Sequence, residues 1–277
     1  NNCGVVALDY IGKRGIATAL GHAPAAGIIS AANGSILSIA ESLTNIVFTP
    51  IEEKLQGISL SANWMWPCKN KGEDARLYEA VEAASNFAKA LGINIPTGKD
   101  SLSMTQKYKD GDVVYSPGTV IITSVGEVTD ITKTIEPVVQ PIDDSIIVYI
   151  DFGKSGQSLG GSAFAQITNS LGNTTPTVTD AQYFAKAFNA IQNCIENKQI
   201  YAGHDISAGG LLTCLLEMNF ANTHSGMNIS IEGFTNSNSV EVLFNENPAI
   251  VIQTNANTLA SLKSQGIECI ELGTVTS

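Results

Sequence analysis

The chain has 277 residues, 44% of them hydrophobic, which is enough apolar side chain for one large domain or two of ordinary size. Its 26 acidic against 15 basic residues give a formal net charge of −11, and such a surface repels a phosphate backbone, so we expect no nucleic-acid partner. No apolar run approaches the roughly 18 residues of a membrane span, and five scattered cysteines are typical of a reduced, cytoplasmic protein.

The first half of the chain predicts strands combined with two long helices. Strands at residues 5–8 and 16–20 should form a hairpin, because the turn between them carries glycines and basic residues. Small and aliphatic residues recur at helical spacing over 24–47, which predicts one long helix. The pattern then predicts a strand at 60–66, an amphipathic helix at 74–91, and strands at 95–104, 113–115 and 119–125.

The segment 135–144, with two prolines and three acidic residues before a buried strand, is the predicted boundary between domains at 1–136 and 137–277. After it we expect strands at 145–150, 227–231, 249–253 and 268–272, and helices at 163–171, 180–197, 210–221 and 257–264. A glycine-rich loop at 153–162 separates the first of these strands from the first helix. The whole pattern predicts an α+β fold.

Two polar residues on the first predicted helix are candidate metal ligands. Glu41 and Asn45 are four residues apart, so their side chains share one face and could hold a cation with two oxygens. On spacing alone, an exposed polar helix face is the commoner interpretation of such a pair.

The segment 203–212 joins a short strand to the start of a helix. Its main-chain N–H groups, including those of Gly209 and Gly210, could point at an anion. Asp205 would then offer a carboxylate to a metal, and Ser207 a hydroxyl to a phosphate. The alternative is a tight turn in which Asp205 or Ser207 caps the helix.

Other candidates carry weaker signals. Lys99 could face a phosphate, or it could pair with Asp100 at a strand end. The loop at 153–162 fits neither a Walker A nor a G-x-G-x-x-G pattern. The histidines show no mutual spacing that suggests a metal or a triad, so we expect structural roles for His22, His204 and His224. No G-x-C-x-G nucleophile elbow occurs, and we expect neither glutamine nor ester hydrolysis from this chain.

Several ordered segments, LSANWM, GED, LYEAV and GKDSLSM, resemble the large phosphoribosylformylglycinamidine synthase family of purine biosynthesis, as do ESLTN at 41–45 and HDISAGGLL at 204–212. The resemblance implies two α+β domains like the N- and C-terminal domains of aminoimidazole ribonucleotide synthetase, the first of them truncated at its N-terminus. It also implies an ATP- and glutamine-dependent carbon–nitrogen ligase of the glutamine amidotransferase type.

The resemblance further implies a magnesium–nucleotide site that takes ATP or ADP. Its implied metal ligands are Glu41, Asn45 and Asp205. Its implied nucleotide contacts are Asn2, Lys99, Ser207, Gly209 and Gly210. The family has aspartate at the positions of Asn2 and Ala208, so the chain lacks two carboxylates there. No residue is assigned a catalytic role.

Implied partners are an N-terminal half of the synthase and a C-terminal glutaminase domain, and exposed strand edges favour a homodimer. Two functions stay open at this point. The chain could be part of an amidoligase whose catalysis needs the missing half, or a non-catalytic auxiliary module that binds ADP. Another ATP-dependent enzyme of the same fold, such as a selenophosphate synthetase relative, is the outside alternative.

Overall fold

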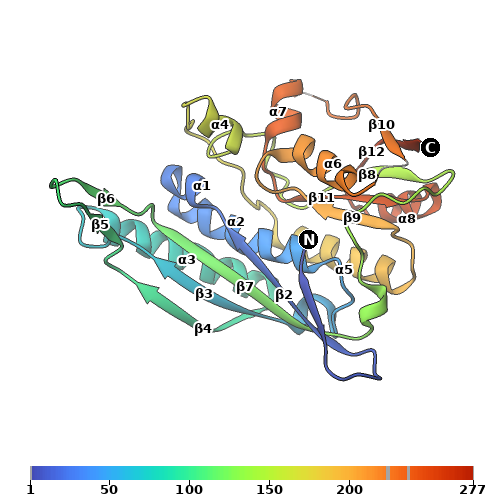
Figure 1. Ribbon diagram of the computed structural model, residues 1–277, viewed down its shortest axis with the longest axis horizontal. Coiled ribbons are helices and arrows are strands. Elements are labelled where there is room, and N and C mark those ends of the chain that lie inside the picture. Colours follow the sequence, from blue (N-terminus) through green and yellow to red (C-terminus); the bar gives the residue numbers. More distant parts are fainter. Residues whose placement is uncertain (1, 223–224, 236–237, 277) are drawn as a thin grey trace.

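The computed structural model describes residues 2–222, 225–235 and 238–276, which form two α+β domains packed side by side (Figure 1). The first sheet has the order β1 (Gly4–Ala7), β2 (Gly15–His22), β7 (Thr119–Val128), β3 (Ile58–Met65) and β4 (Asn94–Ser101). Only its β3–β4 pair is parallel. The second sheet is antiparallel, with the order β10 (Gly226–Ile229), β12 (Cys269–Thr276), β8 (Ile146–Asp151), β11 (Ala249–Thr254) and β9 (Ala202–Asp205).

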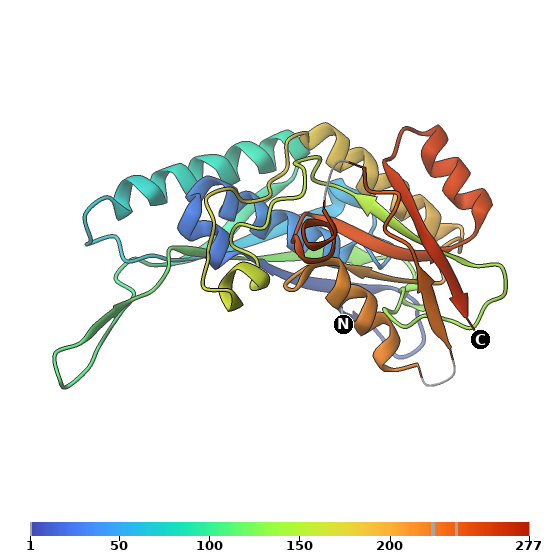
Figure 2. The same cartoon turned by 90° about the horizontal axis from the view of Figure 1, so that it is seen from above.

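Helices α1 (Pro24–Ile29), α2 (Ala31–Ile46) and α3 (Glu73–Leu91) belong to the first domain, and α2 packs directly on β2 and β7. Side chains alternate along β2: Ala17 and Ala19 are buried, whereas Ile16 and Leu20 are exposed on the other face. A small hairpin of β5 (Thr105–Lys107) and β6 (Val113–Tyr115) projects from this domain (Figure 2).

The second domain carries α4 (Ala163–Ile167), α5 (Ala181–Glu196), α6 (Gly210–Phe220), α7 (Ser239–Phe244) and α8 (Ala256–Ser264). Short 3-10 turns lie at Lys54–Gly57 and Ile131–Lys133. Within the ranges that the structure describes, none of the helices has both the length and the apolar character needed to cross a membrane.

Two predicted helices are wrong in extent. The single helix expected over 24–47 is broken at Ser30, whose backbone is extended (φ −142°, ψ 110°) and whose side chain accepts a hydrogen bond from the Asn33 amide. The helix expected over 163–171 stops at Ile167, since Asn169 adopts a left-handed conformation (φ 52°). The hairpin and the other predicted elements are present with shifted ends.

The two domains share one core. Phe48 of the first domain and Ile191 of α5 are fully buried in the same cluster, and Phe87 meets Phe184 edge-to-face at 5.8 Å. The fully buried Gln192 accepts a hydrogen bond from the Ile51 amide (2.8 Å). Its amide nitrogen donates to the carbonyls of residues 47 and 49 (2.7 and 2.9 Å). These contacts fix the domains relative to each other and so fix the site between them.

Candidate functional site

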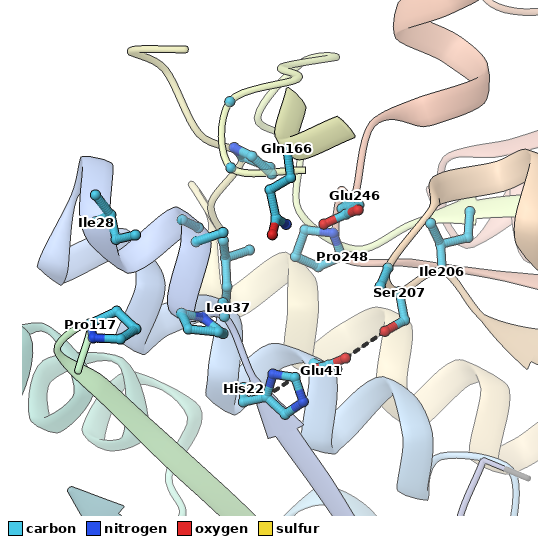
Figure 3. Close-up of a pocket in the computed structure, with 18 of the residues that line it drawn as sticks. His22, Ile28, Leu37, Glu41, Pro117, Gln166, Ile206, Ser207, Glu246 and Pro248 are labelled. Carbon is cyan, nitrogen blue, oxygen red and sulfur yellow. Dashed lines mark hydrogen bonds between the residues drawn. The ribbon is translucent and has the colours of Figure 1, made fainter. Parts of the chain in front are cut away.

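A cavity of about 520 Å³ lies between the two domains (Figure 3). Its wall comes from the β2–α1 corner, α2, the glycine-rich loop, the turn after β9 and the segment before β11. Most of the lining is apolar, and the side chains that bring charge or hydrogen-bonding groups are His22, Glu41, Thr44, Gln166, Ser207 and Glu246. No lysine or arginine occurs among the lining residues in the part of the chain that the structure describes.

Glu41 connects the two domains at this cavity. Its Oε2 accepts a hydrogen bond from the His22 amide (2.6 Å), and its Oε1 accepts one from the Ser207 hydroxyl of the second domain (2.5 Å). Burial raises the pKa of Glu41, the two hydrogen bonds oppose that rise, and the nearby charge of Asp205 adds to it.

The position of Glu41 depends on a glycine. A Cβ on Gly21 would lie 2.1 Å from the Ser38 carbonyl oxygen and 2.4 Å from the Ser42 amide nitrogen. Strand β2 and helix α2 therefore touch main chain to main chain at this point, which brings the His22 amide within reach of the carboxylate.

Two buried side-chain oxygens at strand β9 lack hydrogen-bond donors, and the residues that carry them, Asn2 and Asp205, are not among the residues that line the cavity. Asp205, at the end of β9, is 3% exposed, and its Oδ2 has no partner among the described residues. Asn2 donates from Nδ2 to the Gly203 carbonyl (2.8 Å), and its buried Oδ1 likewise has no partner. A buried acceptor without a donor costs about 1–3 kcal/mol, and a cation would remove that cost at both atoms.

As ligands, the side-chain oxygens of Glu41, Asp205 and Asn2 fit a magnesium ion. Two carboxylates and an amide oxygen are the hard oxygen ligands that Mg²⁺ takes, with its remaining positions left to water or phosphate. Asn45 lies one helical turn from Glu41, and its amide nitrogen donates to the Glu41 carbonyl (3.1 Å). Within the described ranges no group of three or more His, Cys, Asp or Glu side chains is placed to hold a metal ion by itself.

The turn after β9 is not an open anion site. The Gly209 amide donates to Glu246 Oε1 (2.8 Å), and the Gly210 amide donates to the Ser207 carbonyl (3.0 Å). The expectation that these two amides are free is therefore wrong, because the chain's own carboxylate takes one of them and the turn itself takes the other. Their contact with a nucleotide stays a prediction that requires Glu246 to move.

Glu246 is a cavity residue that sequence reasoning missed. Its Oε1 also accepts a hydrogen bond from the Ala163 amide (2.7 Å), so one carboxylate ties the turn before α6 to the turn before α4. Burial raises its pKa, against the two hydrogen bonds. The only local signal was an acidic residue between two asparagines just before a buried strand.

Lys99 is not brought to the cavity. It lies exposed on β4, where its Nζ donates to the Ser101 hydroxyl (3.0 Å). Strands β7 and β3 separate β4 from the strand that carries His22, and three strand spacings of about 4.8 Å amount to about 14 Å. Lys99 therefore lies too far from the cavity to contact a ligand bound there.

Two histidines expected to be structural contact the candidate site. The His22 ring lines the cavity, and the His204 ring contacts Asp205. His224 lies outside the described residues.

Residues 1–127 match the FGAR-AT PurM_N-like domain family, and residues 143–277 match the C-terminal domain family of AIR synthase related proteins. The division at residues 136 and 137 falls between these matches and stays a prediction. A probable phosphoribosylformylglycinamidine synthase from Caenorhabditis elegans is 36% identical, over 97% of this chain and 21% of its own length. The Homo sapiens phosphoribosylformylglycinamidine synthase is 35% identical, over 97% of this chain and 20% of its own length. The chain thus spans about a fifth of the length of the curated relatives it matches.

Solved structures share the fold. Thermotoga maritima PurL complexed with FGAR aligns with a TM-score of 0.78 at 14% identity, over 100% of this chain and 44% of that one. The same protein complexed with ADP aligns with a TM-score of 0.74 at 13% identity, over 100% of this chain and 42% of that one. From both domain matches and from relatives that align along nearly all of its length, the chain belongs to the phosphoribosylformylglycinamidine synthase family.

Proposed function

We propose that the chain binds a magnesium–nucleotide, ATP or ADP, at the cavity between its two domains. The observation that carries this proposal is the pair of buried oxygens without donors at strand β9, Asn2 Oδ1 and Asp205 Oδ2. The charge of Asp205 lies close enough to raise the pKa of Glu41, the carboxylate that lines the cavity. Solved structures of Thermotoga maritima PurL complexed with ATP and with ADP, which share the fold, support the choice of ligand.

Each residue has a role in this proposal. Glu41, Asn45 and Asp205 would hold the ion, and Asn2 would add a neutral oxygen. Magnesium would offset charge on the phosphate oxygens, which the cavity lining cannot do because it contains no cationic side chain among its described residues. The Ser207 hydroxyl would turn from Glu41 to a phosphate oxygen.

We propose further that the chain serves an ATP- and glutamine-dependent amidoligase that converts formylglycinamide ribonucleotide to its amidine. The names of the curated relatives and a PurL structure with FGAR support this substrate. In this proposal the chain contributes nucleotide binding, whereas turnover needs the N-terminal half and the glutaminase domain of a longer synthase. A cytoplasmic location belongs to the same proposal.

Calorimetry with Mg-ADP and Mg-ATP tests the binding step, and an ammonia-dependent turnover assay tests the chemistry. We expect binding that is lost on removal of Mg²⁺ and weakened at least about tenfold in Glu41→Gln, because the ion loses a charged ligand. Glu82→Gln, which makes the same charge change at an exposed position of α3, should bind like the parent chain. Absence of nucleotide binding would refute the proposal, and turnover by the chain alone would favour a complete enzyme.

The open face of the first sheet could contact either a second copy of the chain or another part of a longer synthase. Ile16, Leu20 and Val125 are 41%, 58% and 37% exposed there, which is unusual for large apolar side chains on a sheet face. We propose that the isolated chain dimerises through this sheet. Light scattering should give the mass of a dimer, and Leu20→Asp should give a monomer.

A further inference from the structure

His204 lies between two carboxylates that come from different elements. Its Nδ1 is 2.9 Å from Asp205 Oδ1, and its Nε2 is 3.1 Å from Glu217 Oε2 on α6. The ring is 12% exposed, Asp205 is 3% exposed and Glu217 is 46% exposed. The three side chains thus form a chain of contacts from the surface of α6 to the buried carboxylate at the end of β9.

This contact decides which oxygen of Asp205 is available. The ring engages Oδ1, and Oδ2 is the buried atom without a donor. A carboxylate held at one oxygen cannot rotate freely about its Cβ–Cγ bond, so Oδ2 keeps a fixed direction. A ligand oxygen that is fixed before the ion arrives loses less conformational entropy on binding.

Glu217 fixes the ring in turn. Without it, the imidazole would be held only through Asp205, its neighbour in sequence. With it, the ring is anchored to α6, which packs on β9. Hydrogen bonds of this kind to a metal-ligating carboxylate typically contribute 10–100-fold in metal affinity.

We propose that His204, anchored by Glu217, is a positioning residue that aims Asp205 Oδ2 at a divalent cation. This inference rests on the proposed function, because it needs an ion at Asp205. It assigns no proton transfer to the ring. It accounts for a histidine that does not line the cavity between the domains yet contacts a site residue.

Two substitutions separate positioning from simple packing. The side-chain nitrogen of asparagine can replace Nδ1, whereas that of glutamine can replace Nε2. His204→Asn therefore keeps a donor for Asp205 and loses the contact with Glu217. His204→Gln keeps a donor for Glu217 and loses the contact with Asp205. If the His204 ring only filled space, the two substitutions would have the same effect on the site.

The test is titration of the full chain with Mn²⁺ alone, in which the electron paramagnetic resonance signal measures the concentration of free ion. We expect His204→Gln to bind Mn²⁺ at least about tenfold more weakly than the parent chain, and His204→Asn to lose less than about tenfold. Equal losses in the two variants, or no loss in either, would overturn the inference. A parent chain that binds no Mn²⁺, or a binding parent whose variants are unaffected, would overturn the inference. The proposed function is overturned separately, by the absence of Mg-nucleotide binding in calorimetry.

Glu217→Gln keeps the inference testable where both His204 variants fail to fold, because position 217 is half exposed on the surface. Its neutral amide weakens the anchor of the ring, so we expect a measurable loss of Mn²⁺ affinity smaller than that of His204→Gln. Glu271→Gln removes an exposed carboxylate of β12 in the same domain and should leave the affinity unchanged. Identical affinities in Glu217→Gln and Glu271→Gln would contradict the anchoring role.

Discussion

Glu246 holds a carboxylate in a half-buried position where its ionised form is disfavoured. Because burial raises its pKa in the folded chain, the folded state binds more protons than the unfolded state between the ordinary glutamate pKa, about 4.3, and the raised value. Stability therefore falls as pH rises through this window. Asp151, whose pKa is raised mainly by burial, acts in the same direction.

We expect the melting temperature of the ligand-free chain to fall as the pH rises above the ordinary glutamate pKa, and Glu246→Gln to reduce that slope. Glutamine can still accept the bonds from Ala163 and Gly209 through its carbonyl oxygen, so the variant should fold normally. Glu232→Gln, at an exposed position, is the control and should retain the slope of the parent chain. Parallel melting curves for the parent and Glu246→Gln would contradict this account.

Asn2 occupies a position where an aspartate would add charge to the proposed ion site. Asn2→Asp removes the donor to the Gly203 carbonyl and adds a third carboxylate to the proposed ion site, which already holds Glu41 and Asp205, so the ligand-free variant should be less stable than the parent. With excess Mg²⁺ the added charge should strengthen binding about tenfold. Thermal shift with and without Mg²⁺ measures both effects, and Asn94→Asp on the exposed edge of β4 should show neither.

At the residue scale, sequence reasoning found the side chains that belong to contiguous motifs. The motif at 41–45 and the motif at 204–212 lie at the same place between the domains. Glu41 therefore meets Ser207 and lies near Asp205. Glu246 and the Glu217 contact of His204 were not predicted, since each depends on a pairing between segments far apart in the chain. Spacing within one segment carries no information about such a pairing.

The close approach of β2 and α2 is the feature that matters most at the scale of elements. Gly21→Ala would force the helix away from the strand, and overpacking of this kind costs about 1–3 kcal/mol. The shift would also separate Glu41 from the His22 amide, so nucleotide affinity should fall together with stability. Urea unfolding and Mg-ADP calorimetry measure the two effects.

Gly4→Ala is the matched control on the neighbouring strand. Its added Cβ would come no closer than 3.6 Å to another atom, so its cost should stay within about 0.5 kcal/mol. Equal costs for the two alanine variants would show that contact with α2 does not explain the glycine at position 21.

Helices and strands were predicted well where hydrophobic periodicity is long, as in α3 and α5. The break at Ser30 was missed because periodicity continues through it, while a local cap decides the geometry. Lys99 was misplaced for a different reason. The order of strands in a sheet depends on crossovers that no local pattern encodes, so a motif on β4 could not be located relative to the cavity.

For the whole molecule, Gln192 is the clearest link between domains. Gln192→Ala would remove three hydrogen bonds at once and leave buried main-chain groups of residues 47, 49 and 51 unpaired, at a cost of about 3 kcal/mol or more. Gln265→Ala, at an exposed position after α8, should cost little. Urea titration of the two variants measures the difference.

The shared core also predicts one cooperative unfolding transition. Both tryptophans, Trp64 and Trp66, lie in the first domain, so their fluorescence reports that domain, whereas far-ultraviolet circular dichroism reports both. The two signals should change at the same urea concentration. Separate midpoints would mean that the domains fold independently.

The connection between the domains contains an exposed stretch, residues 141–144, whereas Phe48 and Gln192 hold the domains together elsewhere. A protease that cuts this stretch would sever the covalent link without releasing either piece. The nicked molecule should elute from a sizing column as an intact particle, and its two fragments should separate only on a denaturing gel.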